Sequence, residues 1–571
     1  MVNLKINGIP VSVPEGSTIL QAAKLANVKI PTLCYLKEVQ CVGSCRMCLV
    51  EATGARGLVA ACVYPVSEGM EVSTNTAKVR KSRKTTLELI LSTHNKKCLS
   101  CPRSTNCELQ KLALEYGADE DKFGTDYKDE ALDDVSPSIV RDNTKCVMCT
   151  RCVAACERQT IGAIGPKNRG YAKVIGSPFD VSLANTTCVN CGQCVISCPV
   201  GALYEKSAIG DVWNAIADPS KHVVFYTAPS VRAALGEEFG LPMGTNVEGK
   251  MVASIKGLGN VKCFNMDTTA DLTIIEEANE LLARLKNGGS IPMFTSCCPG
   301  WIKFCEHYYP EFLPNLSSCK SPQEMFSALL KTYYCEKNGI NPADLFVVSV
   351  IPCTGKKYEV TREELGNNTD VALTTRELAK MIKEAGIDFV NVPDAEYDDP
   401  FGLASGAGAI FGATGGVMEA ALRTAAVALG GDGAPIEFTE VRGLKGLKEA
   451  EYTVGGTTVK VAVAHGLGNA RKIMEAVKAG EKDYTFVEVM SCPGGCVNGG
   501  GQPYVSDDVR NSVDVKTLRA KALYNYDTAN KVRCSHDNET VKALYKEFLG
   551  EPNSHKAHEL LHTTYFAKPK Y

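Results

Sequence analysis

Five cysteines in the second half of the chain offer closely spaced, soft ligands for a metal. They lie in three short patches, and each patch directly follows a run of five to seven mostly apolar residues. Such runs are typical of buried strands, and ligands gather beyond the carboxyl ends of the strands in an open α/β sheet. We therefore expect one buried, cysteine-lined metal pocket between the layers of an α/β domain. The patches are Thr295-Ser-Cys-Cys-Pro-Gly300, Pro352-Cys-Thr354 and Cys492-Pro-Gly-Gly-Cys496.

A second cysteine pattern occurs twice earlier in the chain. Each copy has the spacing Cys-x2-Cys-x2-Cys-x3-Cys, which is the run found in bacterial two-cluster ferredoxins. In that pattern the fourth cysteine of each run ligates the cluster of the other run. We therefore assign one [4Fe–4S] cube to Cys146, Cys149, Cys152 and Cys198, and its partner cube to Cys188, Cys191, Cys194 and Cys156.

The N-terminal region combines a predicted β-hairpin with a further set of four cysteines. Residues 2–6 and 11–13 flank an Asn7-Gly8 turn, which indicates a hairpin, and residues 18–26 favour a helix. The cysteines follow on a loop that contains glycine, and their spacing resembles that of [2Fe–2S] ferredoxin modules. Cys41 lies close enough to compete as a ligand, and we interpret it as a spare thiol. The predicted ligands are Cys34, Cys45, Cys48 and Cys62.

A mixed set of one histidine and three cysteines follows. Taken alone, it fits a zinc ion as well as an iron–sulfur cube. Its position between iron–sulfur modules resembles the His/Cys3 [4Fe–4S] sites of multi-cluster enzymes, which favours the cube. A neutral imidazole in place of a thiolate removes one negative charge, so this cluster should accept an electron more easily. The set is His94, Cys98, Cys101 and Cys107.

The three patches closely resemble the cluster-binding motifs of the [FeFe]-hydrogenases, also called iron-only hydrogenases. The resemblance rests on Phe294-Thr-Ser-Cys-Cys-Pro-Gly-Trp301, Pro352-Cys-Thr-Gly-Lys-Lys357 and Met490-Ser-Cys-Pro-Gly-Gly-Cys-Val-Asn-Gly-Gly-Gly-Gln-Pro503. The resemblance extends over nearly the whole chain. Within the family, the chain is similar to the clostridial type, which has four accessory iron–sulfur clusters. Several positions depart from the usual family pattern, which leaves catalytic bias, cluster potentials and oxygen tolerance open: Thr268, Cys319, Ile351 and Ser491.

The resemblance implies a ligand set for the active-site cofactor, the H-cluster. Cys298, Cys353, Cys492 and Cys496 would hold a [4Fe–4S] cube. Cys496 would also bridge to a diiron unit that carries CO, CN⁻ and an azadithiolate with a central amine. Cys297 would be the proton donor to that amine, whereas a buried, inert thiol is the plainer alternative. The positions that match contacts to the cyanides are Pro229, Ser230, Gln323 and Lys356.

A proton path is implied as well. Glu277, Glu280 and Arg284 stand at i, i+3 and i+7, which places them on one face of a helix. An ordinary salt-bridged helix face would show the same spacing. Together with Ser317 these residues match the family's relay, in the order Cys297, Glu277, Ser317, Glu280 and Arg284.

Length, net charge and cysteine content limit the number of domains, the binding partners and the cell compartment that can be expected. A chain of 571 residues suggests about three to five domains. A net charge of −3 gives no electrostatic footprint for nucleic acid or an anionic membrane. The chain has 26 cysteines, and its N-terminus shows no apolar segment of the signal-peptide type. Together these observations favour metal ligation over disulfides. We therefore expect a cytoplasmic protein with no membrane span, and the resemblance to the [FeFe]-hydrogenases implies that it serves an anaerobic hydrogen metabolism.

We expect four modules along the chain. A β-grasp [2Fe–2S] ferredoxin module would cover residues 1–78, and a small His/Cys3 cluster module residues 79–126. A two-[4Fe–4S] ferredoxin module would cover residues 127–209. An α/β catalytic domain, with two parallel-sheet lobes around the buried cluster, would fill residues 210–571.

The implied function is a ferredoxin hydrogenase that catalyses 2H⁺ + 2e⁻ ⇌ H₂ reversibly. Electrons would pass through one [2Fe–2S] and three accessory [4Fe–4S] clusters and exchange with soluble ferredoxin. Maturation enzymes would supply the diiron unit, and the protein would be a monomer or a simple homo-oligomer. One alternative is a catalytic subunit of an NADH-coupled, electron-bifurcating hydrogenase. Another is a hydrogen sensor or an iron–sulfur scaffold without turnover.

Overall fold

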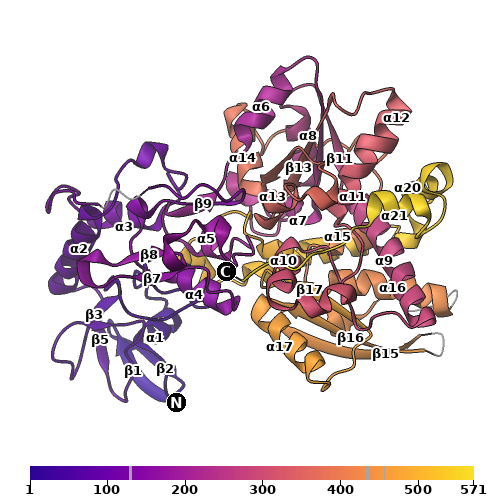
Figure 1. The fold of residues 1–571 in the computed structure, drawn as a ribbon. Coiled ribbons are helices and arrows are strands. Elements are labelled where there is room, and N and C mark those ends of the chain that lie inside the picture. Colours follow the sequence, from indigo (N-terminus) through magenta and orange to yellow (C-terminus); the bar gives the residue numbers. More distant parts are fainter. Residues whose placement is uncertain (128–130, 431–436, 455–456, 571) are drawn as a thin grey trace.

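The computed structural model describes residues 1–127, 131–430, 437–454 and 457–570, and the chain forms two lobes (Figure 1). The smaller lobe, drawn in indigo and purple, contains the predicted accessory-cluster modules. The larger lobe contains two β-sheets surrounded by helices. The undescribed residues fall inside the predicted dicluster and catalytic modules. Across the described ranges, no helix combines the length and apolar character needed to cross a membrane.

The first module is a five-stranded sheet with the order β2-β1-β5-β3-β4. The predicted hairpin is confirmed, because β1 and β2 pair antiparallel around Asn7-Gly8. The predicted helix is also confirmed as α1 (Ile19–Leu25), which begins with a capping box between Thr18 and Gln21. The strands are β1 (Val2–Ile6), β2 (Ile9–Val13), β3 (Leu49–Ala52), β4 (Val59–Ala60) and β5 (Glu71–Ser73).

The next two modules contain little regular structure, and their cysteine loops are held by short elements. Helices α2 (Ala77–Ser92) and α3 (Glu108–Tyr116) pack together around the His/Cys3 set. Each run of the cysteine repeat leads into a short helix, α4 (Arg151–Arg158) or α5 (Gln193–Ser197). Two small hairpin-like sheets complete the lobe: β6 (Ile139–Arg141) with β9 (Leu203–Glu205), and β7 (Gly165–Lys167) with β8 (Val174–Gly176).

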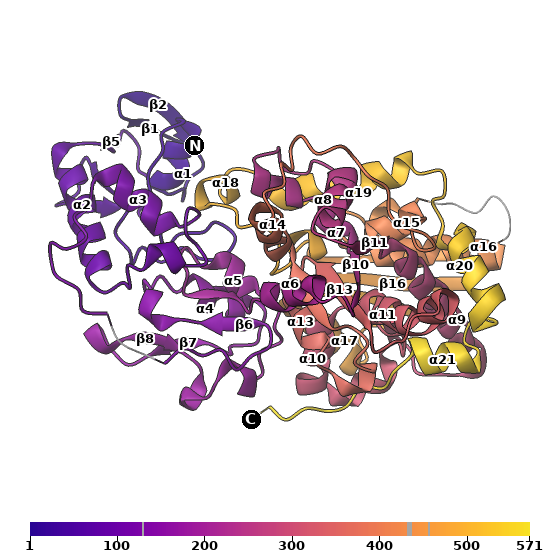
Figure 2. The same ribbon diagram turned by 90° about the horizontal axis from the view of Figure 1, so that it is seen from above.

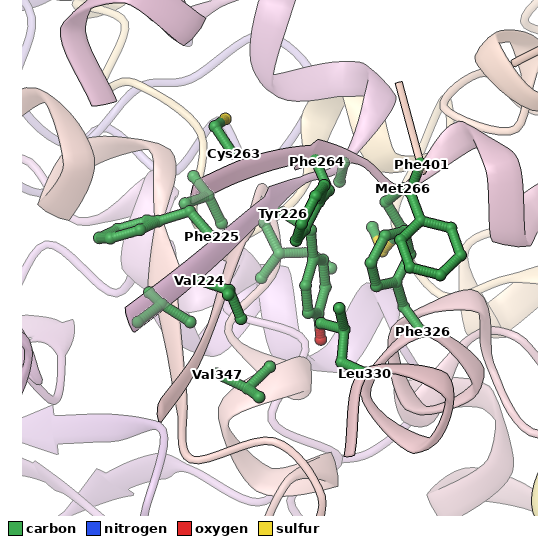
Figure 3. Packing of buried hydrophobic residues seen from close by; sticks show 14 of the residues in the cluster. Val224, Phe225, Tyr226, Cys263, Phe264, Met266, Phe326, Leu330, Val347 and Phe401 are labelled. Carbon is green, nitrogen blue, oxygen red and sulfur yellow. The ribbon is translucent and has the colours of Figure 1, made fainter. Parts of the chain in front are cut away.

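The upper half of the large lobe in Figure 1 contains a fully parallel sheet with the order β11-β10-β13-β14. Its strands are buried on both faces, as continuous apolar runs predict. Figure 3 shows the core beside this sheet, where the Tyr226 ring stacks on Phe326 with centroids 4.7 Å apart. The strands are β10 (His222–Thr227), β11 (Val261–Asn265), β13 (Leu345–Ile351) and β14 (Val371–Thr374). The helices packed on them include α6 (Ile209–Ala217), α8 (Glu248–Lys256), α11 (Pro322–Leu329) and α14 (Thr375–Glu384).

The lower half contains a second sheet with the order β12-β17-β16-β15. Strands β12 (Met293–Phe294), β17 (Phe486–Met490) and β16 (Thr457–His465) are parallel, whereas β15 (Leu447–Val454) pairs antiparallel with β16. The two predicted parallel lobes are therefore confirmed, with one antiparallel edge that was not expected. Side chains alternate between the faces of β16. Val461 and Val463 face α9 (Asp267–Asn287) and α16 (Gly416–Gly430), and Ala462 and Ala464 face α10 (Pro299–Tyr308) and α17 (Leu467–Lys478).

The C-terminal segment ties the lobes together. Helix α18 (Asp507–Arg510) lies beside the N-terminal module in Figure 2, where Lys29 Nζ is 2.8 Å from Asp508 Oδ2. Helices α19 (Val515–Ala529), α20 (Glu539–Leu544) and α21 (His555–Leu561) then pack on the catalytic lobe. As a result, α21 lies against α11 and the loop that precedes it, close to α9.

Candidate active site

The structure brings the three cysteine patches together around one cavity. Its walls come from the residues that directly follow four strands, β10 and β13 of one sheet and β12 and β17 of the other. This is the edge of a parallel sheet at which ligands gather. All nine residues assigned to the H-cluster and its surroundings line the cavity: Pro229, Ser230, Cys297, Cys298, Gln323, Cys353, Lys356, Cys492 and Cys496.

Of the five cavity cysteines, Cys492 is buried, and the other four are partly accessible and line the cavity. Burial raises the pKa of Cys353 to about 11, with a further contribution from neighbouring Cys298. Burial also raises the pKa values of Cys492 and Cys496 well above the usual range, and the surrounding cysteines add to the effect. Thiolates in such a place need a bound cation to replace their protons. The donor set therefore fits a metal centre with sulfur ligands.

Two further observations fit an extended cluster better than a single ion. A tetrahedral zinc ion with bonds of about 2.3 Å would draw its sulfur ligands to within about 4 Å of one another. The cavity cysteines are further apart than that. Among the described residues, the groups that bring three ligand atoms within 4.8 Å of one another contain none of these cysteines. In addition, Ser230 Oγ is buried and has no hydrogen-bond partner within the described ranges. An orphaned hydroxyl in the wall can donate to a bound polar group.

Lys356 supplies a positive charge to the same cavity. Its Nζ donates to Glu359 Oε2 at 2.6 Å. Burial is the largest single influence and would lower the pKa of Lys356, but the charge and hydrogen bond of Glu359, together with the nearby Cys353 and Cys297, raise the pKa above the usual value. Lys356 is therefore a cation in a water-poor site. Gln323 also lines the cavity, and its amide donates to Glu324 Oε1 and to Glu359 Oε2.

Sequence reasoning missed Glu359, which organises this part of the wall. Its Oε2 accepts from Ser321 Oγ at 2.9 Å, from Gln323 Nε2 at 3.0 Å and from Lys356 Nζ. The side chain is buried and lies one helical turn after Lys356 in α13 (Gly355–Glu359). The i, i+3 spacing of a lysine and a glutamate was the available signal, and it is too common to identify a site.

The segment from Cys492 to Gly500 needs glycine where its backbone closely approaches the backbone of other segments. Gly495 has φ of +94°, and a Cβ there would lie 2.6 Å from the Thr414 backbone nitrogen. A Cβ at Gly500 would lie 2.6 Å from the Cys191 carbonyl oxygen. The Cys492 loop thus packs directly on the dicluster module, and Cys492 Sγ is 3.9 Å from that same carbonyl. The contact brings an accessory-cluster loop against the active-site loop.

Ser491 contacts a predicted cluster ligand. Its hydroxyl oxygen lies 3.2 Å from Cys298 Sγ, and its backbone N–H donates to the same sulfur at 3.4 Å. Hydrogen bonds to a ligand sulfur stabilise the more negative, reduced state of an iron–sulfur cluster. The Ser491 hydroxyl is therefore placed to raise the potential of a cluster that Cys298 ligates.

We expect Ser491→Ala to lower the reduction potential of the active-site cube by roughly 20–60 mV, the size of a hydrogen-bond difference of about 1 kcal/mol for one electron. Redox titration of the reconstituted protein, followed by electron paramagnetic resonance, measures this shift. The backbone hydrogen bond remains in the variant, so cluster content should not change. An unchanged potential would show that the hydroxyl does not donate to the sulfur.

The predicted relay residues lie in the predicted order. Glu277 is buried, and burial together with the nearby Glu280 raises its pKa to about 8. The nearby Ser317 hydroxyl partly offsets this rise in pKa, and its Oγ donates to Glu280 Oε2 at 3.0 Å. Arg284 Nη2 lies 2.6 Å from Glu280 Oε1 and is partly exposed. At the inner end, desolvation raises the pKa of Cys297 well above its usual value, and the charge of the nearby Glu277 raises it further.

The four N-terminal cysteines form two pairs. Cys48 Sγ and Cys62 Sγ are 3.4 Å apart. Cys45 donates to Cys34, and this hydrogen bond lowers the pKa of Cys34 to about 5. Two thiol pairs match the need of a [2Fe–2S] cluster, in which each iron takes two cysteine ligands. Cys41 is exposed and its thiol donates to the carbonyl of Cys62, so it is outside both pairs.

The mixed set is arranged around a buried imidazole. Burial lowers the pKa of His94 to about 4, so the ring is neutral and has a lone pair for a metal. His94 Nδ1 is buried and has no hydrogen-bond partner in the described part of the chain. Burial is the main cause of the raised pKa values of Cys98 and Cys107. The charge of Cys101 raises both values further, so Cys101 lies close to both thiols. The set is too open for three ligand atoms within 4.8 Å, which disfavours the zinc alternative.

The dicluster cysteines fall into the two groups that the ferredoxin pattern predicts. Cys146, Cys149, Cys152 and Cys198 line one small cavity. Burial raises the pKa of Cys194, and Cys191, Cys188 and Cys156 raise it further, so these four lie together. The fourth cysteine of each run therefore lies with the other run. Cys191 also lies near Cys492, which places the second group next to the active-site cavity.

Comparison with protein families gives five matches along the chain. Residues 221–500 match the family described as the C-terminal domain of the iron only hydrogenase large subunit, and residues 513–568 match the iron hydrogenase small subunit. The accessory region matches a 2Fe-2S iron-sulfur cluster binding domain at 1–77. It also matches the NADH-ubiquinone oxidoreductase-G iron-sulfur binding region at 83–122 and a 4Fe-4S dicluster domain at 145–202.

Similar proteins span the whole chain. The NADP-reducing hydrogenase subunit HndD of Solidesulfovibrio fructosivorans is 47% identical over 100% of both chains. Iron hydrogenase 1 of Clostridium pasteurianum is 45% identical over 99% of this chain and 100% of its own. Among solved structures, a variant of apo [FeFe]-hydrogenase HydA1 from Chlamydomonas reinhardtii matches with a TM-score of 0.57 and 41% identity. That match covers 64% of this chain and 100% of the other.

Proposed function

The chain belongs to the iron-only hydrogenases and is an enzyme of hydrogen evolution and oxidation, and from this premise we propose that the cavity between its two sheets binds the H-cluster. One observation carries the proposal. Five cysteines from three distant patches line a single buried cavity, together with an orphaned hydroxyl at Ser230 and a cationic Lys356.

Four cysteines would hold the cofactor: Cys298, Cys353, Cys492 and Cys496 would ligate the cube, and Cys496 would also ligate the diiron unit. When bound, the H-cluster supplies the iron chemistry that makes and breaks the bond of H₂. Ser230 and Lys356 would orient the diiron unit, since both offer N–H or O–H donors to an anionic ligand in a dry site. Apolar neighbours such as Ile351, Phe411 and Met490 exclude water from the cavity.

The remaining residues would move protons. The thiol of Cys297 stands in the cavity wall beside a predicted ligand and does not belong to the set of four. Its proton would pass to and from Glu277, whose raised pKa lets the carboxyl group exchange protons near neutral pH. Ser317 would bridge Glu277 and Glu280, and Arg284 would mark the exit to solvent.

Electrons would reach the cavity through the accessory clusters. Gln40 Nε2 donates to the carbonyls of Cys34 and Cys149, at 3.0 Å and 2.6 Å, and thereby joins the [2Fe–2S] loop to the first cube. Arg103 Nη1 donates to the carbonyl of Cys198 at 2.8 Å and joins the His/Cys3 module to the same cube. The second cube adjoins the active site through Cys191 and Cys492. Two entry points would thus converge on one route.

We also propose the four modules at 1–78, 79–126, 127–209 and 210–571. The family matches lie inside these limits, and residues 513–568, which match a separate small subunit, are here part of the catalytic chain. The chain works with an electron carrier, and ferredoxin is our first candidate for it. A complex that reduces a nicotinamide nucleotide is the second, because HndD matches this chain over its whole length. Maturation enzymes would supply the diiron unit.

The proposal is tested with protein matured to contain the diiron unit. Hydrogen evolution from a reduced viologen dye tests the active site alone. Reduced ferredoxin and NADPH, each supplied as the only reductant, then identify the carrier. We expect turnover with dye and with ferredoxin. Turnover with NADPH only after partner subunits are added would favour the complex, and no turnover with dye in iron-replete protein would favour a scaffold.

A further inference from the structure

We propose that Glu280, Cys319 and His562 form a binding site for Zn²⁺ and that zinc in this site blocks the proton relay at Glu280. The inhibitory part rests on the relay proposed above, whereas the metal site rests on geometry alone. The three residues offer a carboxylate oxygen, a sulfur and an imidazole nitrogen, all within 4.8 Å of one another. Zinc accepts this combination of ligands.

Three separate elements hold the ligands in place. Glu280 lies on α9, Cys319 on the loop before α11, and His562 at the end of α21. The backbones of Cys319 and His562 form an antiparallel bridge, so the two side chains come from paired positions. Cys319 Sγ lies 3.9 Å from Glu280 Oε2. The site is therefore assembled by the fold before any ion arrives.

The imidazole is already oriented as in a metal site. His562 Nε2 is 3.0 Å from Glu276 Oε2, and since a carboxylate only accepts, Nε2 carries the proton. Nδ1 is left to accept from Ser318 Oγ at 2.8 Å, and it could exchange that hydrogen bond for a metal. Metal-binding histidines usually donate their second N–H to a carboxylate in this way. Glu276 is buried and is held by Tyr545 OH at 2.5 Å, so the orientation is fixed.

Both oxygens of Glu280 accept from the Ser318 backbone N–H, at 3.2 Å and 3.1 Å, and they otherwise have different neighbours. Arg284 Nη2 forms a salt bridge with Oε1 at 2.6 Å. Oε2 faces Ser317 and Cys319, so it is the oxygen available to a cation. A carboxylate and a thiolate together balance the charge of Zn²⁺, while the Arg284 guanidinium weakens the affinity. Burial, with the charge of Glu280 next, raises the pKa of Cys319, so binding must release the thiol proton to solvent.

Zinc at this site would interrupt the relay because it occupies the same oxygen. Glu280 Oε2 is the acceptor for the Ser317 hydroxyl, which connects Glu280 to Glu277 in the proposed relay. A metal ion on Oε2 removes that acceptor and repels an incoming proton. Three protein ligands leave the fourth position of a tetrahedron for water. The result is a reversible block outside the H-cluster cavity.

The test adds Zn²⁺ alone to the fully assembled enzyme and measures dye-linked hydrogen evolution. We expect zinc to inhibit the wild type and a chelator to reverse the inhibition. The same inhibition of Cys319→Ala should need at least about tenfold more zinc, because a zinc ligand is lost. Zinc X-ray absorption on the same samples should show a sulfur ligand in the wild type and none in the variant. Cys305→Ala is a matched control, because Cys305 is equally buried, belongs to a different hydrophobic cluster from Cys319 and is not one of the three ligands. Cys534→Ala removes the other three-ligand group, which contains His536 and Asp537. Both controls should behave as the wild type.

Each outcome decides a separate part of the proposal. If Cys319→Ala is inhibited at the same zinc concentration as the wild type and shows the same ligand shell, the site is wrong. If zinc binds through Cys319 while turnover is unaffected, the site stands, the inhibitory part is overturned and Glu280 is not on the proton path. Loss of zinc sensitivity in Cys319→Ala alone, with normal turnover, supports both parts.

Discussion

Cys297→Ser is expected to reduce hydrogen evolution by about 10²–10⁴-fold, the range by which a lost proton donor slows a reaction. Serine has nearly the shape of cysteine, but its hydroxyl releases a proton far less readily than a thiol. Cys297 lines the cavity and is not one of the four predicted ligands, so the clusters should assemble normally. Dye-linked turnover, normalised to iron content, measures the effect.

The control for this variant is a cysteine in the same lobe that is neither in the lining of the active-site cavity nor among the relay residues. Cys305→Ser meets this requirement, since Cys305 is fully buried and its thiol donates only to the Tyr309 carbonyl. It should retain turnover of the wild-type order. Should Cys297→Ser turn over hydrogen as fast as Cys305→Ser, Cys297 is an inert packing residue and the proton must enter elsewhere.

Glu277→Gln is expected to reduce turnover by a similar factor, about 10²–10⁴-fold, because glutamine cannot exchange a proton between Cys297 and Ser317. Burial, with Glu280 next, raises the pKa of Glu277 to about 8, so the carboxyl group is mostly neutral at pH 7. Glutamine imitates this neutral form in shape and charge. The clusters should therefore be intact, and the turnover of the variant should no longer depend on a group that titrates near pH 8.

The stability of the same variant gives an independent check. Because the pKa of Glu277 is higher in the folded protein than in the unfolded chain, its stabilising contribution is complete below pH 4.5 and is lost as the pH rises through about 8. Glutamine does not ionise, so the variant should be at least as stable as the wild type above pH 8, as thermal unfolding can measure. Glu276→Gln, its equally buried neighbour outside the relay, should keep turnover of the wild-type order. Wild-type turnover in Glu277→Gln would remove this residue from the path.

Local spacing explains why the cysteine patches could be predicted. The patches follow the apolar runs 290–294, 345–351 and 484–490, and β13 and β17 begin and end within two residues of the last two runs. Strand β12 is shorter than its run, because Pro292 has no N–H to donate to a sheet. Strand β15 was not anticipated, since an antiparallel edge depends on pairing partners and not on the periodicity of its own residues.

Contacts between distant segments could not be predicted in the same way. Glu359 holds Lys356 and Gln323 through side-chain directions that only the folded α11 and α13 define. Cys319 and His562 are 243 positions apart and meet because α21 returns to the loop before α11. The order of the accessory clusters likewise depends on backbone contacts such as that of Gln40 with Cys149, for which the sequence carries no periodic signal.

The central claim is that Cys298, Cys353, Cys492 and Cys496 hold an iron cube that carries a diiron unit beside Cys297. Infrared spectroscopy of the matured protein tests it most directly, because metal-bound CO and CN⁻ absorb where protein groups do not. The account predicts both kinds of band in the matured protein, and their absence when Cys496 is replaced by alanine. A matured protein that contains its full iron and shows neither band would contradict it.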